Sequence, residues 1–149
     1  MKVSNNFVIQ EFVPKETYDL RFPSVWFIDE RVIKIAQFMR DRFKCAMFIN
    51  SWHLQPRNPL SYRGFRPFSG AGAKVGSKYS QHRWGRAFDH HCAGISVQEV
   101  YADIMNNIDL YHDQGVRAVE NIDKTPTWIH IDIRNYIPLK KEASKILIV

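Results

Sequence analysis

Hydrophobic residues recur at helical spacing in two stretches of the chain. Asp29 suits the N-cap of a helix over residues 30–43. The apolar residues that share one face of this helix are Val32, Ile33, Ala36, Met39 and Phe43. Ser96 and Glu99 have the spacing of a capping box, which predicts a second helix from there through about Ile108. Both apolar stripes are expected to pack into the core.

Four shorter stretches have the character of strands. Residues 45–50 are an apolar run of strand length, and residues 86–92 alternate in a way that fits a second strand. Residues 115–120 and 127–134 are separated by a turn-forming stretch, so we expect them to pair as a hairpin. Because helices and strands are segregated along the chain and the pairing is expected to be mostly antiparallel, the order of elements predicts an α+β domain. We expect a small antiparallel sheet flanked by helices.

The length of 149 residues and a hydrophobic content of 45% are typical of one globular domain. We therefore expect a single domain over residues 1–149, with a core at about 29–136. The remaining tail, 137–149, is basic and then apolar, and its end either docks as an edge element or frays. Cys45 and Cys92 are too few for a disulfide framework, so free buried thiols are expected.

Positive charge is concentrated in one part of the chain, here called the basic segment (residues 51–88). The segment has seven basic residues and no acidic one, whereas the whole chain has 21 basic and 15 acidic residues. The rest therefore carries 14 − 15 = −1. Because the basic segment is also rich in glycine and proline, it is predicted to be a long irregular loop with a functional role.

The charge favours an anionic partner but does not choose one. The chain lacks a helix-turn-helix pattern and a zinc-finger spacing, which makes nucleic acid an unlikely partner and favours an anionic cell-wall polymer or a peptide carboxylate. No run of about 18 apolar residues is present, so membrane insertion is not expected. The N-terminus has no apolar run of signal-peptide length.

Histidines paired with carboxylates are the chain's candidate chemistry. His82 precedes Asp89 by seven residues, and His130 alternates with Asp132 along a predicted strand, so the last two point to one face. A His-Asp-His set is a plausible zinc triad with a fourth position left for water, whose pKa the zinc would lower. His90 would face the opposite side of its strand from Asp89, and we do not expect it to be a ligand.

Two motifs give these residues a family context. Residues 80–89, Ser-Gln-His-Arg-Trp-Gly-Arg-Ala-Phe-Asp, match the pattern Ser-x-His-x-x-Gly-x-Ala-x-Asp, and residues 128–132 match aromatic-x-His-x-Asp. Over about residues 29–134 the chain resembles the zinc D-alanyl-D-alanine carboxypeptidases. That family includes phage endolysins that cut L-alanyl-D-glutamate bonds, and it shares its fold with the hedgehog signalling domain. The resemblance implies one Zn²⁺ held by His82, Asp89 and His130, and a hedgehog/DD-peptidase-like fold.

The general base is where the chain departs from this family. Many members carry an acidic residue three positions before the last histidine ligand, where this chain has Thr127. Glu120 is the candidate base, reaching across the hairpin, and Asp123 in the turn is a weaker one. Glu120 is equally well interpreted as a solvated hairpin carboxylate. Asp132 either orients a ligand from behind or makes a hydrogen bond at the strand end.

Substrate-binding residues follow less directly from the resemblance. Ser80 matches a position that relatives use near the substrate. Relatives often have Ser-Gly-Tyr-Arg upstream, where this chain reads Ser-Trp-His-Leu at 51–54, so Arg57 or Arg63 is expected to bind the substrate carboxylate instead. Trp84 is a candidate for lining a groove for glycan or peptide.

These features predict a monomeric zinc peptidase that cleaves peptidoglycan stem peptides, either as a carboxypeptidase or as an L-Ala-D-Glu endopeptidase. Without a signal peptide it would start in the host cytoplasm and reach the wall by release or within a virion, which suggests a bacteriophage origin. The alternative is a non-catalytic zinc-binding module, structural or wall-binding and possibly a virion component. Thr127 at the usual base position favours that alternative.

Overall fold

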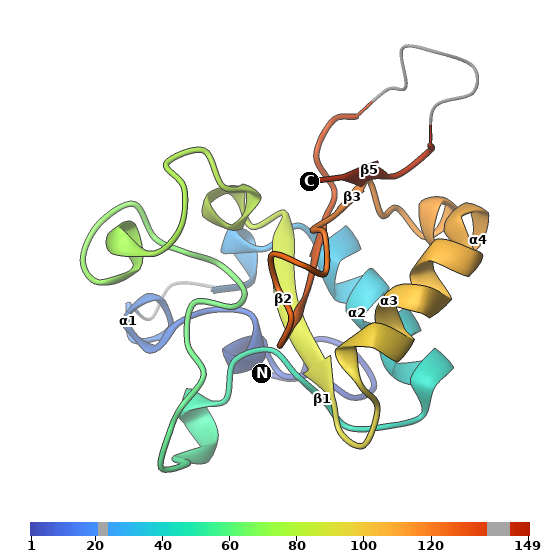
Figure 1. Cartoon of the computed structure of the whole chain (residues 1–149). Coiled ribbons are helices and arrows are strands. Elements are labelled where there is room, and N and C mark those ends of the chain that lie inside the picture. The colour runs from blue at the N-terminus through green and yellow to red at the C-terminus, as the bar shows by residue number, and fades with distance from the viewer. Residues whose placement is uncertain (21–23, 137–143) are drawn as a thin grey trace.

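The computed structural model describes residues 1–20, 24–136 and 144–149. These residues form a mixed α+β fold around a five-stranded sheet of order β1-β2-β4-β3-β5 (Figure 1). The strands are β1 (Met47–Phe48), β2 (Ala87–Cys92), β3 (Ala118–Val119), β4 (Ile129–Asp132) and β5 (Leu147–Ile148). The α-helices are α1 (Lys15–Tyr18), α2 (Glu30–Phe43), α3 (Val97–Asn106) and α4 (Ile108–Asp113). The predicted α+β class is confirmed.

The centre of the sheet is the antiparallel pair β2 and β4, in which Asp89 lies opposite His130. The predicted hairpin is present, with β3 antiparallel to β4, and β1 is antiparallel to β2. β5 runs parallel to β3, so the apolar end of the tail docks at the sheet edge rather than fraying. Ile146, the residue just before β5, is fully buried. The basic part of the tail, residues 137–143, lies outside the described residues.

Both predicted helices form, with the expected caps. The Asp29 side chain accepts a hydrogen bond from the Arg31 backbone N–H at the start of α2. Ser96 and Glu99 form the predicted capping box of α3. The second helix ends at Asn106, earlier than predicted, and the short α4 that follows was not predicted. In Figure 1, α2, α3 and α4 lie on one side of β2 and the basic segment lies on the other.

The core extends beyond the predicted boundary near residue 29. Phe7, Ile9, Phe12 and Val13 are buried members of the same hydrophobic cluster as the sheet and helices. This N-terminal stretch accepts two backbone hydrogen bonds from the chain around the start of the basic segment. The Asn50 N–H donates to the Glu11 carbonyl oxygen, and the Phe65 N–H donates to the Phe12 carbonyl oxygen. The first of these bonds also explains why β1 ends before the predicted limit at residue 50. The chain leaves the sheet there and pairs with the N-terminal stretch instead.

The basic segment contains no strand or α-helix between β1 and β2, a region that the structure describes throughout. It forms only the 3₁₀ turns η3 (Trp52–Leu54), η4 (Gly72–Lys74) and η5 (Gln81–Trp84). Gly85 ends η5 with φ +65°, and a Cβ there would lie 1.9 Å from the Phe27 carbonyl oxygen, so only glycine fits. The predicted irregular loop is therefore present, and it delivers η5 to the start of β2. Among the described helices, none has the length and apolarity needed to cross a membrane.

Candidate metal centre

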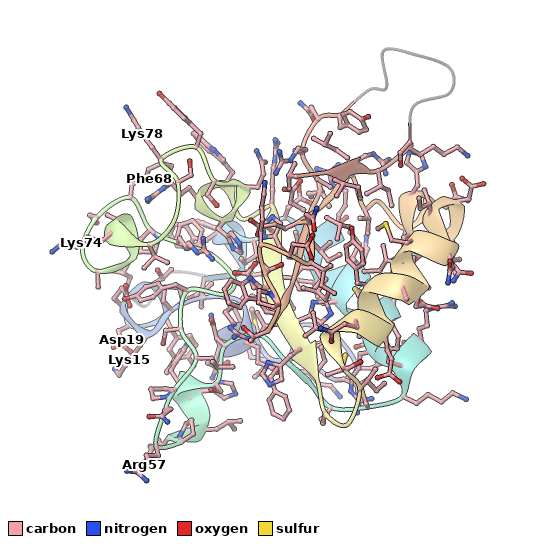
Figure 2. The ribbon with its side chains drawn as sticks, viewed as in Figure 1. Lys15, Asp19, Arg57, Phe68, Lys74 and Lys78 are labelled. Carbon is pink, nitrogen blue, oxygen red and sulfur yellow. The ribbon has the colours of Figure 1, made fainter. Side chains whose placement is uncertain are left out.

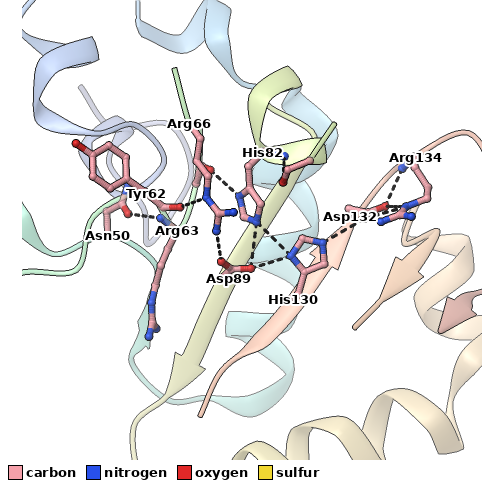
Figure 3. Close-up of polar contacts among 11 residues, drawn as sticks. Asn50, Tyr62, Arg63, Arg66, His82, Asp89, His130, Asp132 and Arg134 are labelled. Atoms are coloured by element: carbon pink, nitrogen blue, oxygen red, sulfur yellow. Dashed lines mark hydrogen bonds and ion pairs between the residues drawn. The ribbon is translucent and has the colours of Figure 1, made fainter. Parts of the chain in front are cut away.

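The three predicted ligands, which come from three different elements, meet in the structure (Figure 3). His82 lies on η5, Asp89 on β2 and His130 on β4. His130 Nδ1 is 2.8 Å from Asp89 Oδ1 and 3.2 Å from His82 Nε2, and 3.1 Å separates His82 Nε2 from Asp89 Oδ1. All three residues are buried, and together they form a group that can hold a metal ion.

The ring nitrogens that face away from this group are held by other acceptors. His82 Nδ1–H donates to the Gly64 carbonyl oxygen at 2.7 Å, which leaves Nε2 free to point into the group. His130 Nε2–H donates to Asp132 Oδ2 at 3.2 Å, which leaves Nδ1 to do the same. Metal-binding histidines in proteins are usually oriented in this way, by a carbonyl or a carboxylate on the far nitrogen.

The spacing of the three inward atoms suits a small tetrahedral ion. Bonds of about 2.0–2.1 Å in a tetrahedron place neighbouring ligand atoms about 3.3–3.4 Å apart. The observed separations of 2.8, 3.1 and 3.2 Å fall short of this by a few tenths of an ångström, which small side-chain rotations supply. Two imidazoles and one carboxylate therefore fit a divalent ion with one position left open.

The charges of the group are unequal. Burial alone would raise the pKa of Asp89, but His82 and His130 outweigh it and lower the pKa, so Asp89 is a carboxylate. Burial lowers the pKa of His82, partly against the attraction of Asp89. Burial also opposes the charge on His130, but its bonds to Asp132 and Asp89 raise its pKa to about 9. Without metal, His130 is therefore protonated on both ring nitrogens at neutral pH. A metal ion that binds Nδ1 must displace the proton there.

Two arginines support the carboxylates of the site. Arg66 Nη2 donates to Asp89 Oδ2 at 2.7 Å, and Arg66 Nε donates to the Tyr62 carbonyl oxygen at 2.6 Å. Arg134 forms an ion pair with the fully buried Asp132, whose Oδ1 also accepts from the Arg134 backbone N–H at 3.1 Å. Asp132 thus makes both contacts that its two predicted roles require, one to His130 and one to the backbone just beyond β4.

A cavity of about 420 Å³ opens onto the group. Its lining includes the three candidate ligands together with Arg66, Ser80, Glu120 and Arg134. The Ser80 hydroxyl also caps η5 by accepting from the His82 backbone N–H at 3.4 Å. Glu120 favours the charged forms of both Arg66 and Arg134. Of the two candidate bases, Glu120 lines the cavity, whereas Asp123 is exposed in the hairpin turn and does not line it.

The two arginines expected to bind substrate do not line the cavity. Arg57 is exposed and lies at an outer end of the basic segment (Figure 2). The Arg63 guanidinium points away from the three ligands, with Nη1 3.0 Å from His91 Nδ1 and its carbon 5.8 Å from the centre of the Trp128 ring (Figure 3). Arg66 lines the cavity instead.

Arg66 was not among the predicted site residues, and contacts with distant parts of the chain bring it to the cavity. Gly64 precedes it by two residues, and a Cβ on Gly64 would lie 2.1 Å from the Phe12 carbonyl oxygen, so the chain passes very close to the N-terminal stretch there. The Arg66 backbone N–H donates to the His82 carbonyl oxygen at 3.1 Å, which ties the two residues together.

The residues flanking the ligands lie where the strand alternation predicted. His90 is fully buried on the opposite face of β2, with its ring centre 5.3 Å from that of Phe88. His91 stacks on Phe48 at 5.2 Å. Neither belongs to the group of candidate ligands. Trp84 is exposed and lies outside the cavity, in a second hollow beside it.

No protein-family model, curated protein or solved structure matches this chain. The chemistry of the site therefore rests on its own geometry. That geometry is a buried group of two imidazoles and a carboxylate, oriented for one metal ion, at the base of a cavity lined by a glutamate and two arginines.

Proposed function

We propose that the protein is a zinc-dependent peptidase that cleaves the stem peptides of peptidoglycan. The observation that carries this proposal is the buried His82, Asp89 and His130 group opening into a cavity that also contains Glu120. The sequence pattern of residues 80–89 supports the same class of enzyme. A bacteriophage lysin, free or virion-associated, is the expected setting.

His82 Nε2, Asp89 Oδ1 and His130 Nδ1 would hold the ion. Zn²⁺ suits two imidazoles and one carboxylate, because it accepts nitrogen and oxygen ligands in a tetrahedron. When bound at such a site, Zn²⁺ polarises a substrate carbonyl and lowers the pKa of water. The fixed outward bonds of the two histidines keep their inward nitrogens aimed at one point.

Glu120 is proposed as the general base. It directly follows β3, and its backbone N–H faces the carbonyl oxygen of His130 at 3.4 Å, which places it beside a ligand across the hairpin. As a carboxylate it would accept a proton from the attacking water and then deliver a proton to the nitrogen of the leaving amine. The C–O bond would form when the water adds to the scissile carbonyl, and the C–N bond would break afterwards, when the leaving amine receives the proton.

Arg66 and Arg134 are proposed to position the substrate. Stem peptides carry free carboxylates, and a guanidinium N–H donates a charge-assisted hydrogen bond to a carboxylate oxygen. Both guanidinium groups lie at the cavity, although each already pairs with an aspartate. Arg66 keeps its contact to Asp89 through one nitrogen, Nη2, so Nη1 is the atom we assign to the substrate.

Digestion of purified peptidoglycan by the zinc-loaded protein tests this proposal. The wild type should release new amino termini, which mass spectrometry locates at one bond of the stem peptide. Glu120→Gln should reduce the rate by about 10²–10⁴-fold, the usual contribution of a general base. Asp123→Asn, in the same hairpin but outside the cavity, is the matched control and should retain the wild-type rate. Release that persists after chelation and in His82→Ala would overturn the zinc mechanism.

A second candidate is a non-catalytic zinc module. It is favoured by Thr127, which stands at the family's usual base position and is exposed outside the cavity. This candidate predicts one bound Zn²⁺ and no new amino terminus in the same digestion. A wild-type protein that binds zinc stoichiometrically and leaves peptidoglycan uncut would establish it in place of the peptidase.

A further inference from the structure

A second hollow of about 460 Å³ lies beside the metal cavity, and aromatic side chains line it. Phe68, Tyr79 and Trp84 are 59%, 75% and 58% exposed, although each is large and apolar. Isolated exposed aromatics are common, but several around one hollow mark a binding surface. None of the residues assigned to the metal, to catalysis or to substrate positioning lines this hollow.

The aromatic rings are held in place by the protein itself. The rings of Phe68 and Trp84 meet edge to face, with centres 5.3 Å apart and planes at 69°. The buried guanidinium of Arg83 lies 5.7 Å from the Phe68 ring centre and donates to the carbonyl oxygens of Ala73 at 2.8 Å and Ser77 at 3.2 Å. Because the chain around the hollow is already fixed, a ligand would bind there with little ordering cost.

The hollow adjoins the metal cavity and is positively charged. Gly76 and Tyr79 line both spaces, so the two lie on either side of these residues. Lys78 lines the hollow, and exposed Lys74 lies on the same side of the molecule (Figure 2). No acidic residue occurs in the basic segment to offset these charges.

We infer that this hollow binds the amino-sugar strand of peptidoglycan while the attached stem peptide enters the metal cavity. A pyranose ring has C–H bonds on its faces and polar groups around its edge. It can therefore pack on Trp84 and Phe68 and still hydrogen-bond to Lys78. The two rings, with planes at 69°, form a corner, which suits a puckered sugar better than the flat base of a nucleic acid. The choice of peptidoglycan as the polymer rests on the proposed function. The sugar strand is the part of that substrate that the catalytic residues do not contact.

Binding of chitotetraose, a β-1,4-linked tetramer of N-acetylglucosamine, tests the inference by isothermal titration calorimetry. The wild type should bind it, and Trp84→Ala should weaken binding at least about tenfold, as expected for a central aromatic anchor. Phe68→Ala is the second variant and should weaken binding in the same direction. Leu54→Ala is the matched control, since Leu54 is 64% exposed in the basic segment and lies outside both spaces. Thermal unfolding of each variant shows whether it is folded.

Three results would overturn the inference. The first is no binding by the wild type up to about 5 mM ligand, well above a millimolar dissociation constant. The second is binding that both Trp84→Ala and Phe68→Ala leave unchanged. The third is that a single-stranded oligothymidylate binds in place of the sugar at physiological salt. The titration needs no turnover, so a protein that binds chitotetraose but cuts no peptide would refute the peptidase and leave the sugar site standing.

Discussion

Asp132 offers a sharp test of how the metal centre is built. Its carboxylate is fully buried, accepts from His130 Nε2 and pairs with Arg134. Asp132→Asn keeps the shape but removes the charge that orients His130. Substitutions behind a metal ligand usually cost 10–100-fold in metal affinity, or about 1.4–2.7 kcal/mol. We expect a loss of this size in zinc affinity, measured by competition with a chromophoric chelator at fixed pH.

The same substitution must also change the metal-free protein. Asp132 is the leading partner that raises the pKa of His130 to about 9, so Asp132→Asn should lower that pKa, as followed by NMR. Arg134→Gln is the control, because it removes the ion pair and keeps the contact to His130. It should weaken zinc binding less than Asp132→Asn does. Unchanged zinc affinity and an unchanged His130 pKa in a folded Asp132→Asn protein would show that Asp132 only terminates the strand.

Three further predictions concern stability. The raised pKa of His130 means that its partners stabilise the metal-free fold fully below the unfolded value of about 6.5. That stabilisation should fade as the pH rises to about 9, as measured by urea unfolding with chelator present; a flat profile over this range would contradict it. Arg83→Ala removes three hydrogen bonds to backbone carbonyls, so it should lower the free energy of unfolding by about 2–4 kcal/mol in the same assay. A loss under about 0.5 kcal/mol would mean that Arg83 does not hold the basic segment. Asp103→Ala should lower the free energy of unfolding by about 1–2 kcal/mol, because it leaves the Tyr111 hydroxyl and the Arg42 guanidinium without their hydrogen-bond partner. Adding Arg42→Ala to that variant should then change the free energy of unfolding by almost nothing.

Local signals in the sequence predicted the parts of the fold that local physics determines. The caps at Asp29 and Ser96 mark where two helices begin, and both helices begin there. The alternation in residues 86–92 separates Asp89 from His90, and the structure places them on opposite faces. The three candidate ligands were predicted by their spacing and by the family pattern, which encode the same turn and strand.

Features that depend on distant contacts could not be predicted in this way. Phe7 and Phe12 lack a regular spacing with the helices, so nothing in the sequence shows that they join the core. Arg63 and Arg66 are three residues apart in an irregular stretch, where no period indicates which one points into the cavity. That choice depends on contacts with His82 and with the N-terminal stretch, both far away in the sequence. The parallel docking of β5 likewise depends on the distant strand β3.

X-ray absorption at the zinc K edge tests the central claim most directly. On the protein loaded with one equivalent of Zn²⁺, the spectrum should show two imidazole nitrogens and oxygen ligands at about 2.0–2.2 Å, without sulfur. His82→Ala should lose one imidazole from this shell or fail to retain the metal. A sulfur shell near 2.3 Å, which would place the metal on Cys45 or Cys92, would contradict the account, as would a wild-type protein that retains no zinc.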